Sequence, residues 1–236
     1  LTGQCYGYLD LKDNIYLNIL TVESTPMQYF PEGNCSNPAP DEDSRVLALP
    51  ALYQLHVKNN SLLVMPNLTK MPKLDVVNFE DSLVEILPGK PFINNTKLRY
   101  LSLLRNKLVQ GPNLEGACTS LVALDMRYNQ LTSLPDNYFN GCTKLDIIHL
   151  SDNKLTSFPN FAPIGSSLTR IYIKYNHLNE TIPKYALTTL NNLYELQLDN
   201  NKMSTFEASF CNLSSSLNCN LKGNSLLQVY NPYRDC

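Results

Sequence analysis

The side chains that most often carry out catalysis are few in this sequence and do not stand in catalytic motifs. It has three histidines, His56, His149 and His177. It has no Cys-x-x-Cys pair, His-x-x-x-His pair, Gly-x-Ser-x-Gly elbow or glycine-rich phosphate loop. The neighbouring acids Glu80 and Asp81 are more typical of a solvated strand edge than of a catalytic pair. The sequence therefore favours a protein that is not an enzyme and that needs no metal, nucleotide or organic cofactor.

Cysteines and glycosylation sequons give a clearer chemical signal. Thiols can form disulfides in an oxidising compartment, and an odd number of them leaves at least one without a partner in the chain. An Asn-x-Ser/Thr sequon accepts an N-linked glycan in a secreted chain. Together they predict an extracellular protein, either secreted or a cell-surface ectodomain. The seven cysteines are Cys5, Cys35, Cys118, Cys142, Cys211, Cys219 and Cys236, and the six sequon asparagines are Asn34, Asn59, Asn67, Asn94, Asn179 and Asn212.

Charge and hydropathy narrow the class of partner. The formal net charge of −2 over 236 residues does not favour a nucleic acid or an anionic membrane. No stretch approaches the run of about 18 apolar residues that spans a bilayer, so we expect no membrane insertion within this sequence. The first residues lack the basic and apolar regions of a signal peptide, which predicts a mature or trimmed chain. The sequence leaves open whether a transmembrane or lipid anchor follows Cys236.

A repeated spacing of apolar residues organises most of the chain. Leu121, Leu124, Met126, Asn129 and Leu131 follow the template L-x-x-L-x-L-x-x-N-x-L, in which the first Leu is position 1. Positions 4 and 6 alternate with polar residues, which predicts a short strand with one buried face. Eight copies occur at spacings of 22 to 25 residues, and they begin at Leu52, Leu74, Leu98, Leu121, Leu145, Leu168, Leu193 and Ser216.

This pattern resembles the extracellular kind of leucine-rich repeat (LRR) protein over residues 46–229. The resemblance implies an α/β solenoid, a curved horseshoe with a parallel β-sheet on its concave face, about eight repeats and disulfide-linked caps. Each repeat buries its apolar face only against its neighbours. The Asn at position 9 is expected to bond backbone groups of adjacent turns and so to form a ladder.

The ends of the chain are predicted to cover the terminal repeats. We divide the chain into an N-terminal cap at 1–45, the LRR solenoid at 46–215, and the last repeat with a C-terminal cap at 216–236. The segment "IYLNILTV" in the first part is expected to be a capping strand, because an open sheet edge needs cover. Cys5 and Cys35 bracket it and are predicted to form a disulfide.

The remaining cysteines leave alternatives open. Cys118 and Cys142 occupy nearly equivalent positions of consecutive repeats, about 5 Å apart in stacked coils, so they form a disulfide or replace core leucines. The segment "NPYRDC" resembles the start of the Asn-Pro-aromatic cap of extracellular LRR proteins. Cys211 pairs with Cys219, or either pairs with Cys236. Cys219 lies at a core strand position and is the best candidate for a free thiol.

Strand positions 3, 5, 7 and 8 are free to vary and should face the concave surface. Tyr and Arg are the residues most enriched at binding hot spots, although Tyr also suits any strand. Sequons off the strands leave this face clear, and only Asn59 would shade its N-terminal end. We therefore predict a binding surface on repeats three to seven, made by Tyr100, Arg127, Tyr128, His149, Arg170, Tyr172, Lys174, Tyr175 and Tyr194.

The resemblance implies a recognition module, the ectodomain of a receptor or a secreted receptor-like protein. Its partner would be a protein or peptide, or a glycan, bound on the concave face. Similar LRR ectodomains act in innate immunity, adhesion and signalling. Two alternatives stay open: a secreted inhibitor of a foreign enzyme or polysaccharide-binding cell-wall protein, and a structural surface-coat glycoprotein. The sequence indicates neither the ligand nor the oligomeric state.

Overall fold

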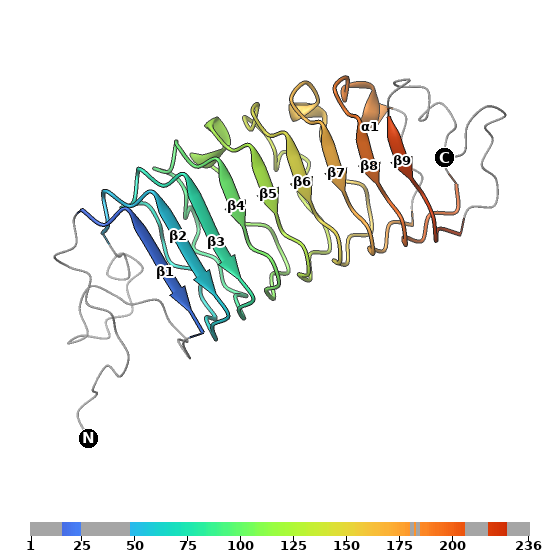
Figure 1. Cartoon of the computed structure of the whole chain (residues 1–236). Coiled ribbons are helices and arrows are strands. Elements are labelled where there is room, and N and C mark those ends of the chain that lie inside the picture. Colours follow the sequence, from blue (N-terminus) through green and yellow to red (C-terminus); the bar gives the residue numbers. More distant parts are fainter. Residues whose placement is uncertain (1–15, 25–47, 180–181, 183–184, 206–216, 226–236) are drawn as a thin grey trace.

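The computed structural model of the chain describes residues 16–24, 48–179, 182, 185–205 and 217–225. Its strands form one parallel sheet in which each strand pairs with the one before it in the chain (Figure 1). This is the solenoid that the repeat pattern predicts. The strands are β1 (Ile19–Glu23), β2 (Gln54–Lys58), β3 (Val76–Glu80), β4 (Tyr100–Ser102), β5 (Ala123–Asp125), β6 (Ile147–His149), β7 (Arg170–Tyr172), β8 (Glu195–Gln197) and β9 (Asn218–Asn220).

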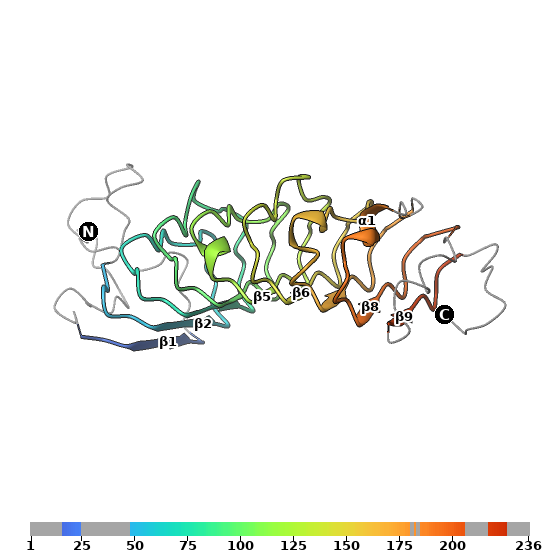
Figure 2. The same ribbon diagram turned by 90° about the horizontal axis from the view of Figure 1, so that it is seen from above.

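The sheet forms one side of the molecule, and the segments that return from each strand to the next form the other (Figure 2). The sheet bows gently along its length, so its open face is concave. Helical structure in the described residues is short. It consists of the 3₁₀ turns η2 (Ala117–Thr119) and η3 (Ala162–Ile164) and the helix α1 (Tyr185–Thr188). The return path is therefore mostly extended and turned chain.

The strands align equivalent repeat positions, which stacks the core into rows. Leu101 lies opposite Leu124, which in turn lies opposite Ile148. All three side chains are buried, as is Phe139, which packs behind the sheet with its ring centroid 5.3 Å from that of Phe161. Because each coil buries its apolar face against the next, the core runs without interruption along the solenoid.

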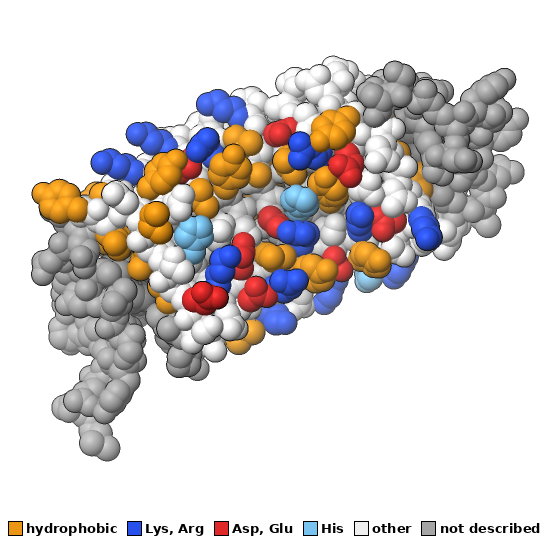
Figure 3. Space-filling view, in the orientation of Figure 1, with side chains coloured by type: hydrophobic (Ala, Val, Ile, Leu, Met, Phe, Trp, Pro, Cys, Tyr) orange, Lys and Arg blue, Asp and Glu red, His pale blue; other side chains and the backbone are white. Residues whose placement is uncertain are grey.

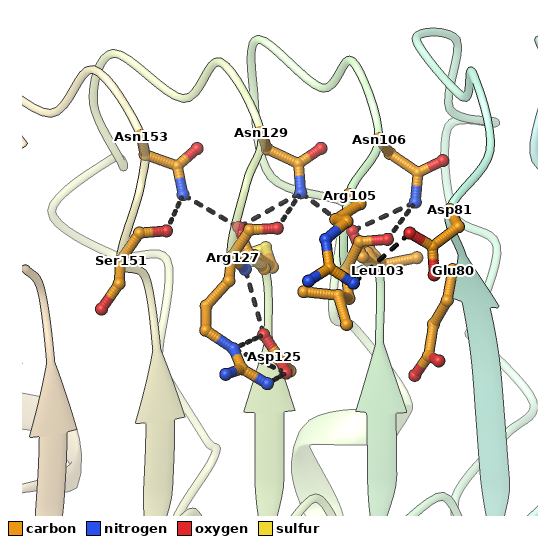
Figure 4. A network of polar contacts seen from close by, with 12 residues as sticks. Glu80, Asp81, Leu103, Arg105, Asn106, Asp125, Arg127, Asn129, Ser151 and Asn153 are labelled. Atoms are coloured by element: carbon orange, nitrogen blue, oxygen red, sulfur yellow. Dashed lines mark hydrogen bonds and ion pairs between the residues drawn. The ribbon is translucent and has the colours of Figure 1, made fainter. Parts of the chain in front are cut away.

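A ladder of asparagine side chains joins the coils where the strands end, except after β3, where Ser82 takes this place. Asn129 donates from its Nδ2 to the carbonyl oxygen of Leu103 in the preceding coil at 2.8 Å. Its Oδ1 accepts from the backbone N–H of Leu108 at 3.1 Å. Asn106 and Asn153 make the same pair of contacts one coil before and one coil after (Figure 4). The ladder predicted from position 9 is therefore present, and it satisfies backbone groups that strand pairing leaves unpaired.

The N-terminal end of the sheet is the expected capping strand. β1 pairs in parallel with β2 over five residues, with Leu20 opposite Leu55. The predicted domain boundaries near 45 and 215 lie outside the described residues, as do Cys5, Cys35, Cys211 and Cys236.

The described cysteines behave in two ways. Cys118 and Cys142 form a disulfide between consecutive coils, which is the first of the two alternatives for this pair. Cys219 is a free thiol on β9, and burial raises its pKa to about 12. It therefore stays protonated at neutral pH.

We predict that replacing Asn129 by Ala lowers the free energy of unfolding by on the order of 2 kcal/mol, because the buried N–H of Leu108 loses its partner and the carbonyl of Leu103 keeps only its bond from Asn106. Urea denaturation measures this. Asn140→Ala is the control, because its side chain is exposed on a return turn and should change stability by less than about 0.5 kcal/mol. Equal stability of the two variants would contradict a structural role for the ladder.

Candidate binding surface on the concave face

The strand face that is not buried presents side chains in regular rows. In β5, β6 and β7 a buried middle residue separates two partly exposed ones, so positions 3 and 5 share the open face. Hydrophobic, acidic and basic side chains are mixed over this face (Figure 3). Their arrangement is set by the register, because residues at the same repeat position lie side by side in neighbouring strands.

The residue that follows each strand from β1 to β8 has a left-handed backbone conformation and forms the edge of the concave face. Position 8 has a φ between 49° and 59° from β1 to β8, including Tyr128 at 55° and Tyr175 at 51°. This conformation is uncommon outside glycine, asparagine and aspartate. It turns the chain so that the position-9 side chain points inward to the ladder. The position-8 side chain stays outside, and Tyr128 and Tyr175 are 46% and 54% exposed.

The structure brings several predicted residues together at the centre of the face. His149 and Tyr172 are register partners on β6 and β7, and their rings stack with centroids 4.4 Å apart. The Tyr172 hydroxyl donates to Oε2 of Glu195 at 2.7 Å. Arg170 lies beside them on β7, with its guanidinium 5.3 Å from the ring centroid of Tyr194. His149 with Tyr172 and Arg170 with Tyr194 thus form two contacting pairs on neighbouring strands, which together we call the central cluster.

The other predicted residues lie around the central cluster. Tyr100 is on β4, where its register partner is the small Ala123, and the guanidinium of Arg99 lies 5.4 Å from its ring centroid. Tyr128 carries Arg105 over its ring at 5.0 Å. Tyr175 follows β7 and no contact of its side chain to another described ring is present. The predicted set therefore shares one face, but it is not one continuous contact.

Most charged side chains of the face are already paired. Arg127 holds Asp125 with two groups, Nη2 to Oδ2 at 2.6 Å and Nε to Oδ1 at 3.0 Å (Figure 4). Lys174 lies 3.6 Å from Asp199. The sequence prediction named Arg127 and Lys174 but missed both acids. The sequence contained a signal for both pairs. Asp125 lies two residues before Arg127 on the same strand face, and Asp199 lies at position 7 of the repeat that follows Lys174.

Burial and neighbouring charges set the protonation of two groups in the central cluster. Burial is the main cause that lowers the pKa of His149. Arg127 and Arg170 lower it further, while Asp125 and Glu195 oppose the shift. Burial, together with the hydrogen bond to Glu195, raises the pKa of Tyr172 to about 12. The central cluster therefore presents a neutral imidazole and a neutral phenol at neutral pH.

Other sites in the described residues are few. No described group of three or more His, Cys, Asp or Glu side chains could hold a metal ion. No helix in the described ranges is long and apolar enough to cross a membrane. A cavity of about 520 Å³ lies among the return turns, between Pro88, Pro112 and Pro135. The sequence analysis did not predict it, because its walls are turns without a repeated position.

The sequons lie where the repeat positions predict. Asn67 is half-buried between β2 and β3, and Asn94 is exposed between β3 and β4. Asn179 is exposed after β7, and Asn59 is exposed directly after β2. Asn34 and Asn212 lie outside the described residues. The described sequons other than Asn59 therefore leave the strands of the concave face uncovered.

We predict that His149 makes the fold less stable in acid. Its native pKa lies below the usual value of about 6.5, so the unfolded chain binds the proton more tightly. The free energy of unfolding should therefore fall as the pH drops through about 6.5 toward the lower native pKa. His149→Phe keeps a ring beside Tyr172 and removes the proton site, so it should lose less stability between about pH 7.5 and 5. Urea titrations of both proteins test this, and equal losses would contradict it.

Comparisons with known proteins agree with this geometry. A family described as "Leucine rich repeat" matches residues 119–178, which include β5, β6 and β7. No curated protein matches the sequence significantly.

Solved structures extend the likeness over most of the chain. A leucine-rich repeat protein of Leptospira interrogans is 21% identical with a TM-score of 0.56, and the match covers 75% of this chain and 50% of that one. YopM from Yersinia enterocolitica is 20% identical with a TM-score of 0.65, and the match covers 91% of this chain and 39% of that one. The chain thus spans half or less of the length of these proteins. The repeats, the parallel sheet and the asparagine ladder give this chain the leucine-rich repeat fold, and residues 119–178 match the leucine-rich repeat family itself.

Proposed function

We propose that this chain is an extracellular recognition module that binds a protein or peptide on its concave face, as a receptor ectodomain or a secreted receptor-like protein. Leucine-rich repeat solenoids commonly bind proteins, and this chain has the fold. The ligand class, the receptor role and roles in immunity or adhesion are our proposals.

The observation that carries the proposal is the exposure of large aromatic side chains on the concave face of the sheet. Tyr100, Tyr128, Tyr175 and Tyr194 are between 41% and 54% exposed. Tyr128 and Tyr175 also hold the left-handed conformation, which a bulky residue adopts only at a cost. The exposed part of each ring lies outside the core and remains open to a partner. It supplies contact area and a hydroxyl to a partner at low entropic cost.

The chemistry of the face also favours binding over catalysis. Asp125 is held by Arg127, Asp199 lies against Lys174, and Glu195 accepts from Tyr172 and Gln197. A carboxylate held in this way is a poor general base, because its lone pairs and charge are already engaged. We therefore propose that the protein is not an enzyme.

An extracellular location rests on a disulfide and on accessible sequons. The Cys118–Cys142 bond is of a kind that persists mainly in oxidising compartments. Asn59, Asn94 and Asn179 are exposed, so a transferase could reach them without unfolding the chain.

We predict that the protein isolated from its natural source carries N-linked glycans at Asn59, Asn94 and Asn179. Enzymatic deglycosylation in ¹⁸O-labelled water converts each occupied Asn to a labelled Asp, which peptide mass spectrometry detects. Asn218 and Asn220, which lie outside sequons, serve as internal controls and should stay unlabelled. Bare asparagines at all three exposed sequons would count against the proposed location.

We further predict that Tyr128→Ala/Tyr175→Ala weakens binding of a partner by at least about tenfold, because truncating a hot-spot tyrosine removes on the order of 2 kcal/mol. The partner would be recovered by affinity capture from extracellular fluid and cell-surface extracts and measured by surface plasmon resonance. Ile86→Ala/Val109→Ala is the matched control, because these exposed side chains lie beyond the strands.

The outcome separates the candidate surfaces. If the control variant keeps its affinity for the partner and the tyrosine variant loses it, the result would support a binding site on the concave face. The identity of the partner would then distinguish a receptor from an inhibitor or a polysaccharide-binding protein. Equal binding by both variants would contradict the proposal and place the site elsewhere.

A further inference from the structure

One arginine of the concave face differs from its neighbours in having no acid to bind. Arg99, Arg105 and Arg127 each lie within ion-pair distance of an aspartate, namely Asp75, Asp81 and Asp125. Arg170 makes no ion pair with any carboxylate in the described part of the chain. Its Nε is buried and donates to no described acceptor. A buried donor of a charged group without a partner is costly, and among the described unpartnered side-chain atoms Arg170 Nε alone belongs to a charged group, so its presence requires an explanation.

The acid that could pair with Arg170 is held by other groups. Arg170 and Glu195 are register partners on β7 and β8. Glu195 nevertheless accepts from the Tyr172 hydroxyl through Oε2 at 2.7 Å and from Gln197 Nε2 through Oε1 at 3.3 Å. Both of its oxygens are thus engaged by position-5 side chains. The guanidinium of Arg170 keeps its donors for another acceptor.

The surroundings of Arg170 hold the guanidinium in place and leave its charge available. Its Cζ lies over the ring of Tyr194, 5.3 Å from the centroid, and this contact restrains the guanidinium without using its N–H groups. Its other register partner, Ile147 on β6, is apolar. Asp125 is paired with Arg127, and burial keeps His149 neutral by lowering its pKa. Glu195 is the acid that lies beside Arg170 as its register partner, and its carboxylate already accepts two hydrogen bonds.

We infer that Arg170 receives a carboxylate of the partner, either an Asp or Glu side chain or a C-terminal carboxylate. The inference rests on the proposed function, since it names the chemistry of a ligand on the same face. A guanidinium offers two parallel N–H groups to a carboxylate, and such charge-assisted pairs are about twice as strong as neutral hydrogen bonds. The unpaired Nε shows that the described chain offers this guanidinium no acceptor, and an incoming carboxylate would bind its outer N–H groups and offset its charge.

The test uses an array of random dodecapeptides, each synthesised with a free and with an amidated C-terminus. Peptides that bind the intact chain are resynthesised with every Glu changed to Gln and every Asp to Asn. For each peptide that binds the concave face, we expect one carboxyl group to be required. Replacing that carboxyl by an amide should weaken binding of the peptide at least tenfold. A side-chain carboxyl and a terminal carboxyl are distinguished by which replacement has this effect.

The same peptides are then measured on Arg170→Gln and on Lys58→Gln. Lys58→Gln is the matched control. It also removes one positive charge from the concave face, but the lysine it replaces is already paired with Glu80 at 3.0 Å. On Arg170→Gln the acid and amide peptides should bind within twofold of each other, while Lys58→Gln should keep the tenfold difference. Thermal unfolding of each variant verifies that the fold is retained.

The remaining outcomes overturn the inference in distinguishable ways. Peptides that require Tyr128 and Tyr175 but show no carboxyl dependence would refute the role of Arg170 and leave the proposed function standing. A carboxyl dependence that persists on Arg170→Gln would refute it equally. Absence of any peptide that depends on the two tyrosines would overturn the inference together with the proposed peptide-binding function.

Discussion

The asparagine ladder is the interaction on which the rest of the structure depends. Each amide bonds backbone groups of its own coil and of the preceding coil, as Asn129 does with Met126 and Leu103. A leucine-rich coil buries its strand end among apolar side chains, where an unpaired carbonyl or N–H is costly. The ladder removes that cost at the repeats that carry the asparagine, while the hydroxyl of Ser82 in the second repeat bonds only its own coil. It also fixes the register, because the amide reaches only one carbonyl and one N–H of its neighbour.

Register, once fixed, separates the scaffold from the surface. Positions 4 and 6 are buried in the first seven repeats, so the residues between them contribute little to the core and can differ from repeat to repeat. The left-handed turn at position 8 completes this division, because it sends position 9 inward and position 8 outward. The outward positions carry a mixture of paired charges and exposed rings. In our account the paired charges keep the face ordered, and the rings with Arg170 supply the contact.

Much of this arrangement follows from the spacing of residues, and the part that does not follow is conformational. The period of Leu, Asn and Leu predicts the strands, the ladder and the face that carries Tyr128 and Tyr172. The need to cover the open edge of the first repeat, together with the segment "IYLNILTV" ahead of it, predicts β1. The sequence alone does not predict that Glu195 bonds Tyr172 instead of Arg170, because two strand neighbours compete for one carboxylate and side-chain geometry decides. The left-handed turn at position 8 has a partial signal in the sequence, because Asn and Asp tolerate that conformation and occupy this position at 59, 81, 152 and 200. Tyr128 and Tyr175 adopt the same turn without giving that signal.

The central claim is that the exposed rings of the concave face are where a partner binds. Hydroxyl-radical footprinting of the free and bound protein tests this at the level of single side chains. The account predicts protection of Tyr100, Tyr128, Tyr175 and Tyr194 in the complex, with Ile86 and Val109 modified equally in both states. Protection of Ile86 or Val109 with unchanged modification of the four tyrosines would contradict it.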